Sequence, residues 1–107
     1  MRRLVILAAA LALGTAAQAA DIEKGKAKAA QVCAACHGPD GSKPVAPENP
    51  ILAGQYYDYL VKALSDYKSG KRNNAIMKTF ADQLSKKDIE DVSAFFAAQK
   101  SNLHFQR

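Results

Sequence analysis

The stretch Cys33-Ala34-Ala35-Cys36-His37 is the most informative segment of this sequence of 107 residues. It is a C-x-x-C-H motif, the signature of covalent haem attachment. Near the end of a helix, side chains three and four positions apart share a face. Cys33 and Cys36 can therefore both reach the two vinyl groups at one edge of a porphyrin, where thioether bonds consume both thiols. The imidazole of His37 can then reach the iron. The motif predicts one covalently bound haem c.

Two other kinds of site also use paired cysteines. A redox dithiol of the thioredoxin type is expected among alternating strands and helices, and no segment here has the period of a strand. A structural zinc site needs four ligands. Cys33, Cys36, His37 and the distant His104 make a poor set for zinc. We therefore favour haem attachment over both alternatives.

The motif ends a predicted helix. Its pattern runs from Ile22 to Cys36, with Asp21 placed as the N-cap. Gly25 and Ala29 lie on one face at helical spacing, which lets another helix approach closely. The helix is expected to stop at Gly38-Pro39, where glycine can adopt a left-handed conformation and proline prevents continuation.

A long loop and three further helical segments follow the motif. All four prolines fall between residues 38 and 54, which predicts a loop there. A second helix is predicted from Gln55 to Ser69, and a short helical turn from Ala75 to Ala81. These segments and the final one make the predicted class all-α.

The last helix has the clearest local signals. Ser85 and Asp88 have the spacing of a capping box. Leu84 and Ile89 have the spacing of a hydrophobic staple around it. The apolar stripe continues to a predicted end near Gln99.

The iron of a bound haem would need a sixth ligand or an open site. Met77 is the only methionine besides Met1, and it follows a turn rich in glycine and asparagine that can direct a side chain at the ring. A thioether is a soft ligand that raises the reduction potential. Met77 can alternatively be read as core filling, since methionine often packs irregular gaps. The competing ligand His104 lies in a polar tail, and we interpret it as a surface residue.

The N-terminal segment resembles a secretory signal peptide. Arg2 and Arg3 form a positive start, Leu4 to Leu13 form an apolar run, and Ala17-Gln18-Ala19 offers a cleavage site. The apolar run is about half of the roughly 20 residues needed to span a bilayer. We expect residues 1–19 to be removed and residues 20–107 to form one domain in the periplasm, without stable membrane insertion. Losing two arginines from a formal charge of +5 leaves a mildly basic chain, which disfavours nucleic acid as a partner.

Taken in order, these landmarks resemble a family. The chain is similar to the small bacterial class I cytochromes c, to the cytochrome c-553 group and to single halves of the two-haem relatives. The resemblance spans roughly Asp21 to Gln99 and implies a fold of about four helices around one haem c. It also implies His37 and Met77 as axial ligands, with the Pro50 carbonyl accepting a hydrogen bond from the His37 ring. Leu52 is expected on the haem face.

The leading hypothesis is a soluble periplasmic one-electron carrier rather than an enzyme, acting as a monomer between redox protein partners. Two alternatives remain at this point: a cytochrome subunit of a larger dehydrogenase or oxidase, and a haem enzyme or gas sensor with an open iron position. Lys71, Arg72 and Lys78 flank Met77 and could attract an acidic partner. Charges beside a turn are more commonly just solvated, which is the simpler interpretation.

The family resemblance also places Gly25 where the first and last helices cross. The neighbours expected there are Phe95 or Phe96 of the last helix.

Overall fold

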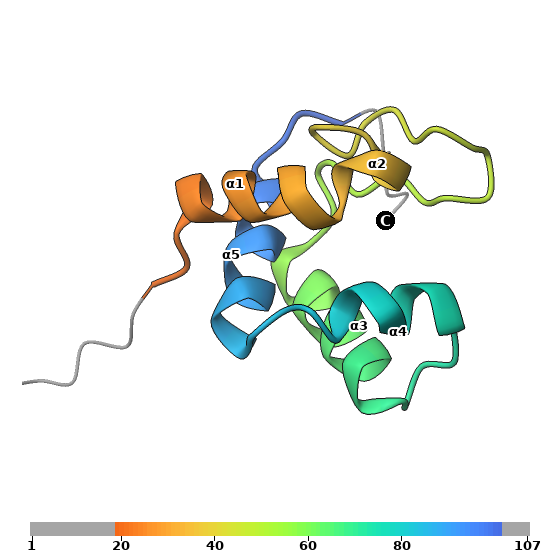
Figure 1. The fold of residues 1–107 in the computed structure, drawn as a ribbon. Helices are drawn as coiled ribbons and strands as arrows, with labels where there is room; N and C mark the ends of the chain where they lie inside the picture. The colour runs from red at the N-terminus through yellow and green to blue at the C-terminus, as the bar shows by residue number, and fades with distance from the viewer. Residues whose placement is uncertain (1–18, 102–107) are drawn as a thin grey trace, which may run out of the picture.

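The structure is a computed structural model that describes residues 19–101, and within that range it is entirely helical. The expectation of an all-α fold is therefore confirmed. Figure 1 shows α1 and α2 above, α5 behind α1, and the pair α3 and α4 below. The helices are α1 Ile22–Val32, α2 Ala34–His37, α3 Tyr57–Ser69, α4 Ala75–Ala81 and α5 Lys86–Ala97.

Helix α1 crosses α5 in close contact. Gly25 and Ala29 of α1 are buried at this crossing, as the small-residue face predicts. A Cβ added at Gly25 would lie 2.0 Å from the backbone oxygen of Asp91 and 3.1 Å from the Cβ of Phe95. Glycine is therefore required here by the close approach of the two helices.

The N-terminal end of α1 is fastened to α5. Asp91 is only 3% exposed, and its Oδ1 accepts hydrogen bonds from the Asp21 N–H at 2.8 Å and from the Lys87 ammonium at 2.6 Å. Burial alone would raise the pKa of Asp91, but these hydrogen bonds and the positive charges of Lys87 and Lys24 together outweigh it, and the pKa is lowered. The carboxylate thus remains charged while joining two helices distant in sequence.

The prediction of a single helix from Ile22 to Cys36 is wrong in one detail, because the helix is interrupted at Cys33. The φ of Cys33 is −105°, far from the ordinary helical value near −63°. Its carbonyl accepts from both the Cys36 N–H at 3.3 Å and the His37 N–H at 3.0 Å. The chain therefore begins a separate short turn, α2, which carries most of the motif.

The next two helices follow the sequence signals closely. The second helix begins two residues later than predicted, at Tyr57, and ends as predicted at Ser69. Gly70 ends it in the left-handed conformation, with φ of 87°. The short turn from Ala75 to Ala81 is confirmed as α4.

The capping box of α5 is present as predicted. The Ser85 Oγ accepts from the Asp88 N–H at 3.0 Å, and the Asp88 carboxylate accepts from the Ser85 N–H at 2.9 Å. Leu84 and Ile89 are both buried in the core, consistent with the predicted staple. The core comprises Ala29, Leu60, Leu84, Ile89, Val92, Phe95 and Phe96.

Two predictions fall mainly or wholly outside the described residues. All of the proposed signal peptide except Ala19 lies outside them, and so does His104. In the part that the structure describes, no helix combines the length and apolar character needed to cross a membrane.

Candidate haem site

All the predicted cofactor-binding residues line one cavity. Its volume is about 370 Å³, and its walls come from every helix and from the loop between α2 and α3. The structure brings together the two thiols, the imidazole and the thioether, although they come from separate segments of the chain. The residues predicted from the sequence that line it are Cys33, Cys36, His37, Pro50, Leu52 and Met77.

His37 is held in one orientation by the loop. It is 6% exposed, and its Nδ1 lies 2.9 Å from the carbonyl oxygen of Pro50. A carbonyl oxygen can only accept, so Nδ1 carries the proton and donates this hydrogen bond. The lone pair is consequently on Nε2, the nitrogen available to a metal. A hydrogen bond on the second ring nitrogen also makes an imidazole a more basic ligand.

The loop is fastened to the motif at a second point, which was not foreseen from the sequence. The carbonyl oxygen of Cys36 accepts from the Val45 N–H at 3.1 Å and from the Asn49 side-chain amide at 3.1 Å. Asn49 precedes Pro50, so the same short segment contacts both the motif backbone and the His37 ring. The one sequence signal for this contact was the amide side chain of Asn49, in the loop that the family resemblance already placed against the motif.

The environment of Cys33 bears on the alternatives for the two cysteines. Burial raises the pKa of the Cys33 thiol to about 11, so a free thiol at this position would be protonated near neutral pH. The thiolate is the form that binds metals and exchanges disulfides. Moreover, residues 19–101 contain no group of three or more His, Cys, Asp or Glu side chains suited to a metal ion. Both findings disfavour the dithiol and zinc alternatives.

Met77 lies on the first turn of α4, and its side chain lines the cavity. Asn74 begins this helix, because its Oδ1 accepts from the Ile76 N–H at 3.1 Å and from the Met77 N–H at 3.0 Å. The backbone of Met77 is therefore itself part of the helix cap. Phe80, one turn further along α4, lines the same cavity and was not singled out from the sequence.

Leu52 serves the cavity and the core at once. Its side chain is partly buried against the core and also lines the cavity. Its N–H donates to the carbonyl oxygen of Gly41 at 2.9 Å, which closes the loop on itself. The core interpretation and the haem-face interpretation of Leu52 are thus compatible.

Two of the three charges proposed for docking make contacts within the protein. The Arg72 guanidinium lies 4.8 Å from the centre of the Tyr67 ring and donates to the Tyr59 hydroxyl at 3.4 Å. The Lys78 ammonium binds the carbonyl oxygen of Lys68 at 3.0 Å. Both side chains remain exposed, and each also makes a contact within the protein.

The donor set and the walls of the cavity fit a haem. Paired thiols, one imidazole and one thioether are the groups that hold haem c, and side chains such as Leu60, Leu64 and Phe96 supply apolar walls. The Ser93 hydroxyl also lines this cavity, is fully buried, and has no hydrogen-bond partner within residues 19–101. A buried hydroxyl normally has a partner, so the Ser93 hydroxyl is a buried polar group of the cavity wall that has no partner among the described residues.

Comparisons with known proteins agree with this site. The family model described as Cytochrome c matches residues 22–100. Cytochrome c4 of Pseudomonas aeruginosa is 48% identical over 90 residues, covering 84% of this chain and 44% of that protein. The "Thiosulfate dehydrogenase electron acceptor" of Stutzerimonas stutzeri is 42% identical over 95 residues, covering 84% of this chain and 44% of that protein.

A solved structure matches as well. The reduced recombinant cytochrome c4 from Pseudomonas stutzeri superposes with a TM-score of 0.72 at 42% identity, covering 79% of this chain and 48% of that one. The chain thus spans about half the length of these relatives. The family match over nearly all described residues confirms the resemblance to class I cytochromes. The chain belongs to the cytochrome c family, and it carries one haem c bound covalently through Cys33 and Cys36.

Proposed function

We propose that this protein is a soluble one-electron carrier whose haem iron is six-coordinate, with His37 and Met77 as its two axial ligands. The observation that carries the proposal is that both side chains line the cavity that Cys33 and Cys36 also line. Haem c, when bound, supplies reversible one-electron chemistry at its iron. If His37 and Met77 both bind the iron, no position on the metal is left for a substrate, and we therefore propose that the protein is not an enzyme.

The protein's own residues suit that role by limiting movement. The hydrogen bond from His37 to Pro50 fixes the imidazole, and the Asn74 cap fixes the backbone of Met77. Ligands that are already held in place need little reorganisation when the charge of the metal changes. A soft, neutral thioether also favours the ferrous state and so raises the reduction potential. These features support electron transfer over the gas-sensor and haem-enzyme alternatives, which require an open iron position.

The proposal is tested by carbon monoxide binding to the ferrous holoprotein. We expect the intact protein to bind carbon monoxide poorly, because Met77 occupies the position that the gas needs. Met77→Ala should bind it readily and should have a lower reduction potential. Thr79→Ala is the matched control: Thr79 lies on the same helix, its hydroxyl donates to the Ala75 carbonyl within that helix, and the variant should behave as the unaltered protein does. Ready binding by the unaltered protein would contradict the proposal.

We further propose that the mature protein is a periplasmic monomer that exchanges electrons with other redox proteins. The signal-peptide pattern of residues 1–19 and the mild positive charge support this. A relative whose name describes an electron acceptor of a dehydrogenase supports redox proteins as partners. Sedimentation analysis of the holoprotein recovered from the periplasmic fraction tests its location and its monomeric state. Recovery of the uncleaved chain, or of a stable dimer, would contradict them.

A further inference from the structure

The short helix α4, which carries Met77, depends on α3 for its position. Among the helices, α3 is the one against which α4 packs substantially. Helix α4 has only seven residues, too few to be stable without contacts to the rest of the protein. Whatever fastens α4 to α3 therefore determines where the Met77 thioether lies.

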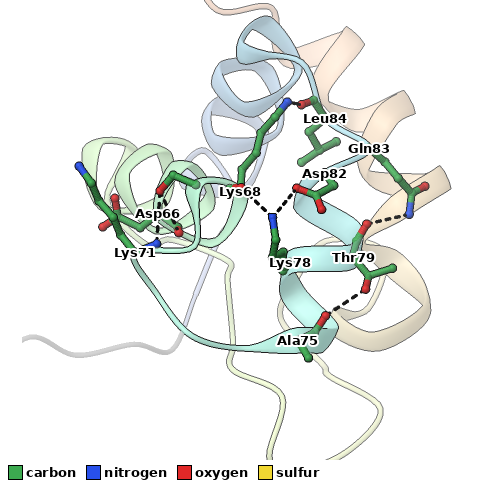
Figure 2. A network of polar contacts seen from close by, with 10 residues as sticks. Asp66, Lys68, Lys71, Ala75, Lys78, Thr79, Asp82, Gln83 and Leu84 are labelled. Carbon is green, nitrogen blue, oxygen red and sulfur yellow. Dashed lines mark hydrogen bonds and ion pairs between the residues drawn. The ribbon is translucent and has the colours of Figure 1, made fainter.

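Two lysines make that connection, and Figure 2 shows them side by side between the helices. The Lys78 ammonium, from α4, donates to the backbone carbonyl oxygen of Lys68 on α3 at 3.0 Å and to the Asp82 carboxylate at 3.1 Å. The Lys68 ammonium in turn donates to the carbonyl oxygen of Leu84, in the turn after α4. One lysine thus extends from α4 to α3, and the other extends from α3 to the turn that follows α4.

The carbonyl that Lys78 reaches belongs to the last turn of α3, where backbone oxygens have no partner within the helix. Its neighbours in that turn are satisfied locally: the Asp66 oxygen accepts from the Arg72 N–H, and the Tyr67 oxygen from the Gly70 N–H. The Lys68 oxygen is satisfied by a lysine ten residues away. A cation there also interacts favourably with the negative end of the helix dipole.

We propose that Lys68 and Lys78 form a clasp that positions Met77 as the sixth ligand. The proposal rests on the function proposed above, because it presumes that Met77 binds the iron. Lys78 acts through α4 and does not itself touch the haem site, so it is a positioning residue. Lys78 immediately follows Met77, and its hydrogen bond to α3 resists the outward movement of α4 that would withdraw the thioether.

The two contacts of Lys78 are not equivalent. Its ion pair with Asp82 lies within α4, at a spacing of four residues, and both side chains are 48% exposed. Exposed pairs of this kind contribute little, because water and salt screen them. The hydrogen bond to Lys68 is exposed as well, but unlike the ion pair it joins two helices. Of the two contacts of Lys78, it is therefore the one that opposes separation of α4 from α3.

The test measures how often Met77 leaves the iron. Carbon monoxide can bind ferrous protein only while the thioether is withdrawn, so its observed association rate reports that opening. Loss of one hydrogen bond corresponds to roughly a fivefold change in an equilibrium constant. We expect Lys78→Met to raise the rate about fivefold while the helical circular dichroism stays native. The same variant should lose the near-infrared sulfur-to-iron band of the ferric protein at a lower guanidinium concentration than the unaltered protein does.

Three comparisons keep the result specific. Lys71→Met removes the same charge near the same turn, and the Lys71 side chain points away from α4 in Figure 2, so the rate of this variant should be unchanged. Asp82→Asn removes the ion pair but keeps the cross-helix bond, and its rate should also be nearly unchanged. Lys78→Gln, whose side chain is too short to reach α3, replaces Lys78→Met if the latter does not accumulate.

The outcomes separate the two proposals. If the unaltered protein binds carbon monoxide readily, Met77 is not the ligand, and the proposed function fails together with the clasp. If the unaltered protein resists the gas but Lys78→Met behaves like Lys71→Met, the clasp alone is overturned. A full effect from Asp82→Asn would also overturn the assignment to the cross-helix bond.

Discussion

Replacing Gly25 with alanine tests whether the crossing of α1 and α5 is as close as the structure shows. The added Cβ would lie 2.0 Å from the backbone oxygen of Asp91 and 2.5 Å from the carbon of the same carbonyl. A comfortable contact between such atoms is more than 3 Å, on the order of 3.5 Å for carbon pairs. The obstructing atoms belong to the backbone of α5, so no side-chain rotation can relieve the overlap. The two helices would have to separate by more than about 1 Å.

Two effects of opposite sign set the magnitude. Overpacking of a close contact costs about 1–3 kcal/mol, and a backbone clash belongs at the upper end of that range. Alanine in a helix interior is more favourable than glycine by about 1 kcal/mol. The net loss in the free energy of unfolding is then about 2 kcal/mol. The clash therefore outweighs the gain in helix propensity.

Guanidinium unfolding of the ferric holoprotein, followed by helical circular dichroism, measures this loss. With a slope of about 3 kcal/mol per molar, the midpoint should fall by about 0.7 M. Ala27→Gly is the matched control, because Ala27 is an exposed position on the same helix and its substitution isolates the propensity difference of about 1 kcal/mol. An unchanged or higher midpoint for Gly25→Ala would refute the reasoning, since it would mean that the helices do not approach this closely.

Three further predictions concern the cap of α4, the buried carboxylate and the cofactor. Asn74→Ala should cost about 1 kcal/mol of local stability, seen as earlier loss of the near-infrared sulfur-to-iron band; band loss that coincides with the unaltered protein would contradict the cap's role. The native pKa of Asp91 lies below its ordinary value of 3.8, so the contribution of this carboxylate to stability is full above about pH 5 and is lost as pH falls through the native pKa. Asp91→Asn should therefore lower the free energy of unfolding near neutral pH and make it fall less steeply in acid. Urea titrations at a series of pH values measure this, and a variant whose stability profile runs parallel to that of the unaltered protein would count against it. A Cys33→Ala, Cys36→Ala double variant, which cannot hold haem covalently, should be largely unfolded because a chain of this size has a thin core; native-like helical circular dichroism of the apoprotein would show otherwise.

Local signals explain why much of the fold was predictable from the sequence. The capping box at Ser85 and the proline-rich segment 38–54 act over a few residues, and the structure has helix and loop where these signals place them. The five-residue motif likewise marks a covalent haem site without knowledge of the fold. The bounds of α4 follow from its turn and its asparagine cap.

Several features of the fold and of the site were not predicted from the sequence. The interruption at Cys33 was missed, because the local pattern continues through it as helix. The amide of Asn49 on the Cys36 carbonyl became visible only when the loop was folded back on the motif. Lys78 looked like a surface charge, and only the packing of α4 on α3 shows that its ammonium binds the other helix. For Asn49 and Lys78, the sequence shows a suitable side chain but not its partner.

The most direct test of the central claim is the position of the Met77 methyl resonance in the ferrous holoprotein. Protein labelled with ¹³C at methionine methyl groups contains two candidates, Met1 and Met77, and Met1 lies in the predicted signal peptide. A thioether bound to the iron holds its methyl group over the face of the porphyrin, where the ring current shields it strongly. We predict a single methionine methyl signal far upfield of the ordinary methyl region. A methyl signal at the ordinary position in folded ferrous protein would contradict the claim that His37 and Met77 close the iron of an electron carrier.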